Sequence, residues 1–162
     1  MTKTNILIFF AIAGLTFGLK AQDKLNLKWG TIEPGDFVLP ESDLEACNRL
    51  CRQIHGHDRE GELRDAIKQG TAKVVEHLGR ITGYATDIGI FAHAVGETNQ
   101  DIKALIAGAP EIGGGGLLLP TRNGELFRWC LQNGLRLVHQ MTLMTIGLYN
   151  EPAGAYLPSV LY

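Results

Sequence analysis

Apolar residues recur every three to four positions in four stretches of the chain, which is the spacing of a helix that buries one face. These stretches predict helices at about 41–56, 61–70, 99–109 and 124–133. In the last of them the spacing turns Leu126, Phe127, Cys130 and Leu131 inward, and Arg128 and Gln132 toward water. Residues that favour helix ends flank the four stretches. The expected N-caps are Ser42 or Asp43 and Asn123, and the expected closing glycines are Gly56, Gly70 and Gly134.

Runs rich in β-branched and aromatic residues lie between these helices and predict strands. The stretch 71–95 contains a tight turn at Leu78 and Gly79, so we expect a hairpin followed by a longer strand. Further strands are expected at 117–119, along the run RLVHQMTLMTIGLY at 136–149, and at 155–162. The predicted class is therefore α/β (α+β), with a mixed, mostly antiparallel sheet and helices on both faces.

The chain has 162 residues, of which 45% are hydrophobic and 20% charged, and this suits one globular domain. We assign that domain to 41–162 and a linker or first strand region to 22–40. Residues 1–21 have the layout of a signal peptide: Lys3, then an apolar run from Ile6 to Leu19, then the small residue Ala21. The run would span about 21 Å as a helix, short of the roughly 30 Å of a bilayer core, so we expect no stable membrane insertion. A buried first strand is the alternative for this run.

Two parts of the sequence indicate different cellular compartments. The leader indicates secretory export. The body of the chain has only three cysteines, Cys47, Cys51 and Cys130, too few for a disulfide scaffold, and this is typical of a cytoplasmic protein. Localisation therefore stays open at this point.

Charge and motifs exclude several classes of function. The net charge is −2, from 17 acidic and 15 basic residues without a basic block, so we expect no nucleic-acid partner. The chain contains no nucleophile elbow, Walker loop or dinucleotide fingerprint. Cys47, Cys51 and His55 recur every four residues, a spacing that suits zinc, but both cysteines fall on an apolar stripe. Core packing is the favoured interpretation, and we predict no metal.

Three segments resemble the GNAT superfamily of N-acetyltransferases. VVEHLGRITGYA at 74–85 is similar to the second and third strands of that superfamily. The spacing from Asn123 to Gly134 and Leu135 is similar to its fourth helix, and 136–149 to its sixth and seventh strands. HGHDREGELRDAI, LLLPTRNGELFRWC and YLPSVLY further resemble the C-terminal half of bacterial proteins with two such domains in tandem. The resemblance covers about 41–162.

The resemblance implies that acetyl-CoA enters between two parted strands, one running toward Val95 and the other through Leu119, and pairs with their free main chain. The residues that it assigns to this co-substrate are Val95, Gly96, Leu118, Leu119 and Asn123. His55 and His57 would border the entrance for the acceptor substrate. Glu97 would act as the base, and Cys130, at the position of the usual tyrosine, as the acid.

The junction at 94–101 departs from the superfamily, whose phosphate-binding loop there is rich in glycine and carries a basic or amide side chain. It contains a single glycine and two carboxylates, Glu97 and Asp101, which repel a pyrophosphate. Two hypotheses follow. The first is an N-acetyltransferase that transfers an acetyl group from acetyl-CoA to a small-molecule or peptide amine. The alternative is a non-catalytic binding or regulatory domain of the same fold, paired with a partner GNAT domain or with a second copy of itself.

Overall fold

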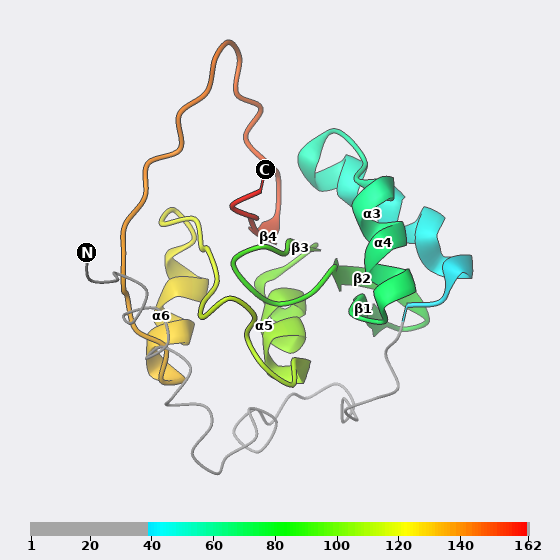
Figure 1. The fold of residues 1–162 in the computed structure, drawn as a ribbon, viewed down its shortest axis with the longest axis horizontal. Coiled ribbons are helices and arrows are strands. Elements are labelled where there is room, and N and C mark those ends of the chain that lie inside the picture. Colours follow the sequence, from blue (N-terminus) through cyan, green and yellow to red (C-terminus); the bar gives the residue numbers. More distant parts are fainter. Residues whose placement is uncertain (1–38, 162) are drawn as a thin grey trace, which may run out of the picture.

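The structure is a computed structural model and describes residues 39–161. The predicted leader at 1–21 and nearly all of the 22–40 region lie outside the described residues. In chain order the elements are a 3-10 turn η2 (Glu41–Asp43), α3 (Leu44–His55), α4 (Glu60–Gln69), β1 (Lys73–His77), β2 (Arg80–Ala85), β3 (Ala94–Gly96), α5 (Asn99–Gly108), α6 (Gly124–Gln132) and β4 (Ala155–Leu157). Their arrangement is shown in Figure 1.

The four strands form one antiparallel sheet in the order β1-β2-β3-β4. The predicted hairpin is confirmed, because β1 and β2 are joined by Leu78 and Gly79 with φ of 52° and 73°. Positive φ at both positions gives a turn that matches the right-handed twist of the strands. The predicted α+β class is likewise confirmed.

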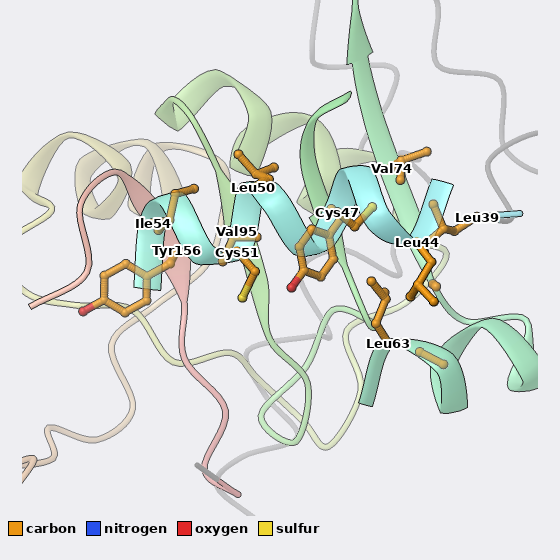
Figure 2. Packing of buried hydrophobic residues seen from close by; sticks show 13 residues of the cluster. Leu39, Leu44, Cys47, Leu50, Cys51, Ile54, Leu63, Val74, Val95 and Tyr156 are labelled. Carbon is orange, nitrogen blue, oxygen red and sulfur yellow. The ribbon is translucent and has the colours of Figure 1, made fainter. Parts of the chain in front are cut away.

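Each face of the sheet buries its own hydrophobic cluster, since alternate residues of a strand point to opposite sides. On one face Val74, Val95 and Tyr156 pack against α3 and α4, as Figure 2 shows. On the other face Val75 and Ala94 pack against α5 and α6. The sheet is therefore the middle layer of three, which confirms the expectation of helices on both faces.

The sheet and α5 approach closely where two strands carry glycine. A Cβ atom on Gly83 or Gly96 would lie 2.9 Å or 2.8 Å from Cβ of Asp101, closer than real Cβ contacts. Glycine at both positions therefore allows the first turn of α5 to rest directly on β2 and β3.

The four predicted helices are confirmed, with bounds within three residues of those expected. Gly56, Gly70 and Gly134 adopt the left-handed conformation expected after a helix, with φ of 81°, 71° and 88°. Asn123 is the predicted N-cap of α6, and its side chain accepts a hydrogen bond from the Leu126 amide at 3.2 Å. The N-cap of α3 is Asp43, whose side chain makes no capping bond because η2 leads directly into the helix.

Three predicted strands are wrong. The stretch 117–119 is not a strand, and 136–149 is an exposed, irregular segment rather than a long β run. The strand after the hairpin is short, with only Ala94–Gly96 assigned to β3.

On α6, Leu126 and Cys130 are buried as predicted, but Phe127 is half-buried and Leu131 is 45% exposed. A narrower stripe than expected contacts the sheet, since α6 lies at the rim of its layer (Figure 1).

Candidate functional site

The end of β3 is where the resemblance located the acetyl-CoA cleft. Val95 pairs with Tyr84 of β2 on one edge and with Tyr156 of β4 on the other. Gly96 pairs in the same way with Gly83 and Ala155. The expected parted pair of strands is therefore wrong for this conformation: both edges of β3 are occupied, and β4 takes the place where the cleft was expected.

Leu118 and Leu119 were expected to line the other wall of that cleft. Both are half-buried in an irregular segment, and Leu119 packs with Leu117 against the cluster beneath α5 and α6. The Leu119 side chain thus lies at the edge of a hydrophobic core, and the main chain of both residues belongs to no strand.

Asp101, one of the two carboxylates expected to repel a phosphate, is turned into the protein. It is 2% exposed and accepts hydrogen bonds from the Thr98 amide and hydroxyl, both at 2.8 Å. The Thr82 hydroxyl donates a third bond at 2.6 Å. The carboxylate thus caps the start of α5 and does not face a ligand at that helix end.

Glu97, the predicted base, forms a two-pronged ion pair with Arg80 through both of its carboxylate oxygens. This guanidinium lowers the pKa of Glu97 below its ordinary value. A carboxylate with a lowered pKa is a weaker base, so the pair makes Glu97 less suited to remove a proton. The same pair offsets its negative charge beside the start of α5.

The N-terminal ends of α5 and α6 meet through polar side chains. Asn123 donates a hydrogen bond to Asn99 at 2.7 Å, and Asn99 donates one to Glu125 at 2.9 Å. Lys103 completes the set with an ion pair to Glu125 at 2.7 Å. Asn123 and Gly96, two residues assigned to the co-substrate, therefore lie at the region where β3 ends and two helices begin.

Cys130, the predicted acid, is 5% exposed in the cluster beneath α6. Burial raises its pKa to about 11, against a smaller opposing effect of Lys103. Within residues 39–161 no hydrogen bond or ion pair joins it to Glu97. The structure therefore does not bring the two predicted catalytic residues together.

His55 and His57 lie on the other side of the sheet, around the turn between α3 and α4. His57 lines a hollow of about 440 Å³ together with Asp58, Arg59, Glu60, Gly61 and Glu62. The His55 side chain is buried, and its ring centroid lies 5.8 Å from that of His57. It also makes an edge contact with the Tyr156 ring, at a centroid distance of 5.3 Å. Burial, reinforced by His93 and His57, lowers the pKa of His55 to about 4. It is therefore neutral near pH 7.

A line of polar side chains runs from this hollow into the core. Oε2 of Glu62 lies 3.1 Å from Nδ1 of His93, out of line for a hydrogen bond. Nε2 of His93 lies 3.0 Å from the Tyr84 hydroxyl, which is fully buried. His93 and Arg59 lower the pKa of Glu62 to about 2, so its carboxylate is ionised. The Glu62 carboxylate favours the His93 tautomer that carries its proton on Nδ1, and Nε2 of His93 then accepts a hydrogen bond from the Tyr84 hydroxyl.

Two further buried polar atoms beside the hollow have no hydrogen-bond partner among the described residues: Oδ1 of Asn48 and Nδ1 of His55. Asn48 is 1% exposed and donates its amide to Glu60, a residue of the hollow, at 3.3 Å. Buried acceptors without a partner are uncommon in folded proteins and mark places where a water or a ligand donor fits.

The resemblance assigned His55 and His57 to an acceptor entrance, and of the two only His57 lines the hollow, while Glu62, His93 and Tyr84 were not predicted. Their association depends on the packing of α4 against β2 and β3, and no local spacing encodes that contact. The sequence signal for this group was His93, which directly precedes the short apolar strand β3. Among the described residues no group of three or more His, Cys, Asp or Glu could hold a metal ion, and all three cysteines are free. No helix within 39–161 is long and apolar enough to cross a bilayer.

Searches with protein-family models, against curated proteins and against solved structures find no match to this chain.

Proposed function

We propose that this domain is an N-acetyltransferase that transfers an acetyl group from acetyl-CoA to an amine. In that reaction the amine attacks the thioester carbonyl, a C–N bond forms and the C–S bond breaks. The proton that the amine loses ends on the departing thiolate, so the products are an amide and the free thiol of CoA. The proposal rests on the sequence resemblance over 41–162 and on one observation above all. Two helix N-termini meet beside the end of β3. Three carboxylates lie there: Asp101 is buried under hydrogen bonds, and Glu97 and Glu125 are ion-paired with Arg80 and Lys103.

That observation suits the pyrophosphate end of a coenzyme. Helix N-termini present amide groups and a partial positive charge to an anion. The charge of Glu97 is offset by Arg80, and Asp101 is turned inward, where its carboxylate is held by hydrogen bonds from Thr98 and Thr82. Asn123 and Gly96 would hold this end of the molecule.

The other end of the coenzyme does not fit the structure as it stands. An arm that pairs like an added strand needs a free edge on β3, and both edges are occupied. Binding in that manner would require β4, which is only three residues long, to leave β3. The thioester arm therefore has no strand edge to pair with in this conformation.

The hollow around 57–62 is where we place the acceptor amine. Three of its six lining residues are carboxylates, namely Asp58, Glu60 and Glu62, although each is ion-paired with an arginine that offsets part of its charge. Neutral His55 offers a free Nδ1 beside them that could accept an N–H bond. Glu62 and His93 would then orient the amine and take up part of the charge of its departing proton.

A second candidate is a non-catalytic binding or regulatory domain. It is favoured by the occupied edges of β3, which leave no main chain for a thioester arm. It is also favoured by the pKa values of Glu97 and Cys130, which move in directions that weaken a base and an acid.

Calorimetric titration with acetyl-CoA separates the two candidates. We expect binding tighter than about 1 mM, which corresponds to roughly −4 kcal/mol. Arg80→Glu should weaken it about tenfold, because the change frees the Glu97 charge and adds another beside the helix ends. Arg64→Glu is the matched control, since Arg64 is also exposed and ion-paired but lies on α4.

The enzyme proposal is contradicted if the protein releases no heat with millimolar acetyl-CoA. If Arg80→Glu and Arg64→Glu weaken acetyl-CoA binding equally, the effect reflects only the overall charge of the protein. That result would contradict the location of the coenzyme site beside β3.

A further inference from the structure

An ion pair between Lys103 and Glu125 joins α5 to α6, two helices that lie side by side in Figure 1. Nζ of Lys103 lies 2.7 Å from Oε1 of Glu125. The side-chain amide of Asn99 donates a hydrogen bond to Oε2 of the same carboxylate at 2.9 Å. Both oxygens of one carboxylate are therefore held by donors from α5, one by an ammonium and one by an amide.

The two partners of this ion pair are buried to very different degrees. The Lys103 side chain is 9% exposed, whereas that of Glu125 is 60% exposed. A lysine so far from water is uncommon unless an anion is paired with its ammonium. Lys103 is thus the fixed member of the pair, and the Glu125 carboxylate is the member that can turn into solvent.

The groups that hold this carboxylate are of the kind that binds phosphate in proteins. An ammonium attracts a phosphate as a point charge, and N–H donors at the start of a helix add to the binding. Asn99 is the first residue of α5, and Asn123 at the start of α6 donates a hydrogen bond to it at 2.7 Å. An anion from the chain itself therefore already occupies a position that suits a phosphate.

The charge of Glu125 opposes a second anion at this position. Lys103 and then Asn99 lower the pKa of Glu125, so its carboxylate is ionised near pH 7. Arg128, further along α6, also acts on this carboxylate with its positive charge. If Glu125 turned away, the charges of Lys103 and Arg128 would be available to another anion.

We propose that Glu125 is an internal anion that covers a phosphate site on Lys103 and Asn99, and that the pyrophosphate of the coenzyme displaces it. No covalent bond changes: the carboxylate turns into solvent, and phosphate oxygens accept hydrogen bonds from the two freed donors. Because the carboxylate is largely exposed, water solvates it when it turns away, and breaking the pair costs little. The site lies where the proposed function needs it, since α5 begins at Asn99 shortly after β3 ends at Gly96.

The assignment of the coenzyme as ligand rests on the proposed function, whereas the displacement of Glu125 can be measured with inorganic pyrophosphate alone. The test is calorimetric titration of the full chain with pyrophosphate at constant pH and ionic strength. Glu125→Gln should bind it about tenfold more tightly than wild type, because the variant removes one opposing charge and keeps the shape of the side chain.

Lys103→Met in the Glu125→Gln background should reverse that gain, since methionine fills the buried space without an ammonium. Circular dichroism should show the wild-type fold for each variant. Asn99→Ala in the same background, at a half-buried residue, makes the same comparison without a change in the buried lysine. A double variant that binds pyrophosphate as tightly as Glu125→Gln overturns the proposed donors.

Glu45→Gln is the matched control. The ion pair of Glu45 with Arg52 is also 2.7 Å long, and the Glu45 side chain is 61% exposed, but this pair lies on α3, across the sheet from α5. The control should leave the affinity for pyrophosphate unchanged. Equal gains in Glu45→Gln and Glu125→Gln overturn the proposal, because the effect would then be one of overall charge. No gain in Glu125→Gln overturns it too, because the pair would then serve only to join the two helices.

Acetyl transfer by wild type separates this inference from the proposed function. If Glu125→Gln gains affinity for pyrophosphate through Lys103 but wild type transfers no acetyl group, the phosphate site is supported and the proposed function fails. If wild type transfers acetyl and Glu125→Gln binds pyrophosphate no better than wild type, the function is supported and this inference is overturned.

Discussion

Buried histidines dominate the polar chemistry at the scale of single residues. His55 and His93 are 5% and 2% exposed, and burial lowers the pKa of both. Their imidazoles contact aromatic rings, His55 with Tyr156 and His93 with Tyr84. Both therefore stay neutral in the folded protein at pH values where an unfolded histidine is already charged, and this ties stability to pH.

Stability should fall as the pH is lowered from about 6.5 to about 4. The folded pKa of His55 is about 4 and the unfolded value 6.5, so in this window the unfolded chain binds more protons and acid favours unfolding. One such histidine contributes up to about 1.4 kcal/mol per pH unit. Urea unfolding at several pH values measures the slope.

The His55→Gln variant should show a shallower slope in the same window, whatever its absolute stability. His139→Gln is the control, because His139 is exposed, and its slope should equal that of wild type. An unchanged slope in His55→Gln would mean that the buried imidazole does not titrate as described.

Tyr84→Phe should destabilise the protein by about 1–3 kcal/mol. The change leaves Nε2 of His93 buried without a partner, while the ring packing stays the same. Tyr156→Phe is the control, since the Tyr156 hydroxyl makes no hydrogen bond among the described residues, and it should cost well under 1 kcal/mol. Similar losses in the two variants would contradict the hydrogen bond to His93.

Helices were predicted from the sequence more accurately than strands, and the reason is physical. Helix signals are local: the spacing of Leu44, Leu50 and Ile54, or the cap at Asn123, lies within a few residues of the element that it specifies. Strands need a partner far away in sequence. The β-branched pattern at 136–149 indicates a tendency to form a strand, but this segment joins no sheet among the described residues, and β3 pairs instead with β4.

Contacts between elements explain why the candidate site was predicted only in part. Gly96 and Asn123 mark the ends of elements, so sequence alone could assign them. The hydrogen bond from Thr82 to Asp101 and the ion pair of Arg80 with Glu97 depend on how β2 packs beside β3 and α5. The sequence showed only two carboxylates and so predicted repulsion.

Gly83→Ala should cost about 1–3 kcal/mol, because the new methyl group would lie 2.9 Å from Cβ of Asp101 and 3.3 Å from the Val95 carbonyl oxygen. Gly61→Ala is the matched control. Gly61 is in α4 with open space around it, and alanine there should stabilise by about 0.5–1 kcal/mol. Thermal unfolding compares the two variants, and equal effects would contradict the tight contact between α5 and the sheet.

The three layers of the whole molecule divide its candidate chemistry between two sides of the sheet. The meeting point of α5 and α6 beside β3 suits an anion, whereas the hollow between α3 and α4 suits an amine. An acetyltransferase needs both groups to reach one point. In this structure β4 lies along the edge of β3 that a thioester arm would use, so movement of β4 is the conformational step that the proposed activity requires.

Acetyl transfer itself tests the central claim most directly. The full chain is mixed with acetyl-CoA and a panel of primary amines, and the free thiol of CoA and the amide product are measured together. We predict one thiol released per amide formed for at least one amine, with the rate reduced about tenfold by Arg80→Glu. The rate should be unchanged by Lys68→Glu, since Lys68 is exposed and ion-paired on α4 but does not line the hollow. Thiol release no faster than without protein, for every amine tested, would contradict the account.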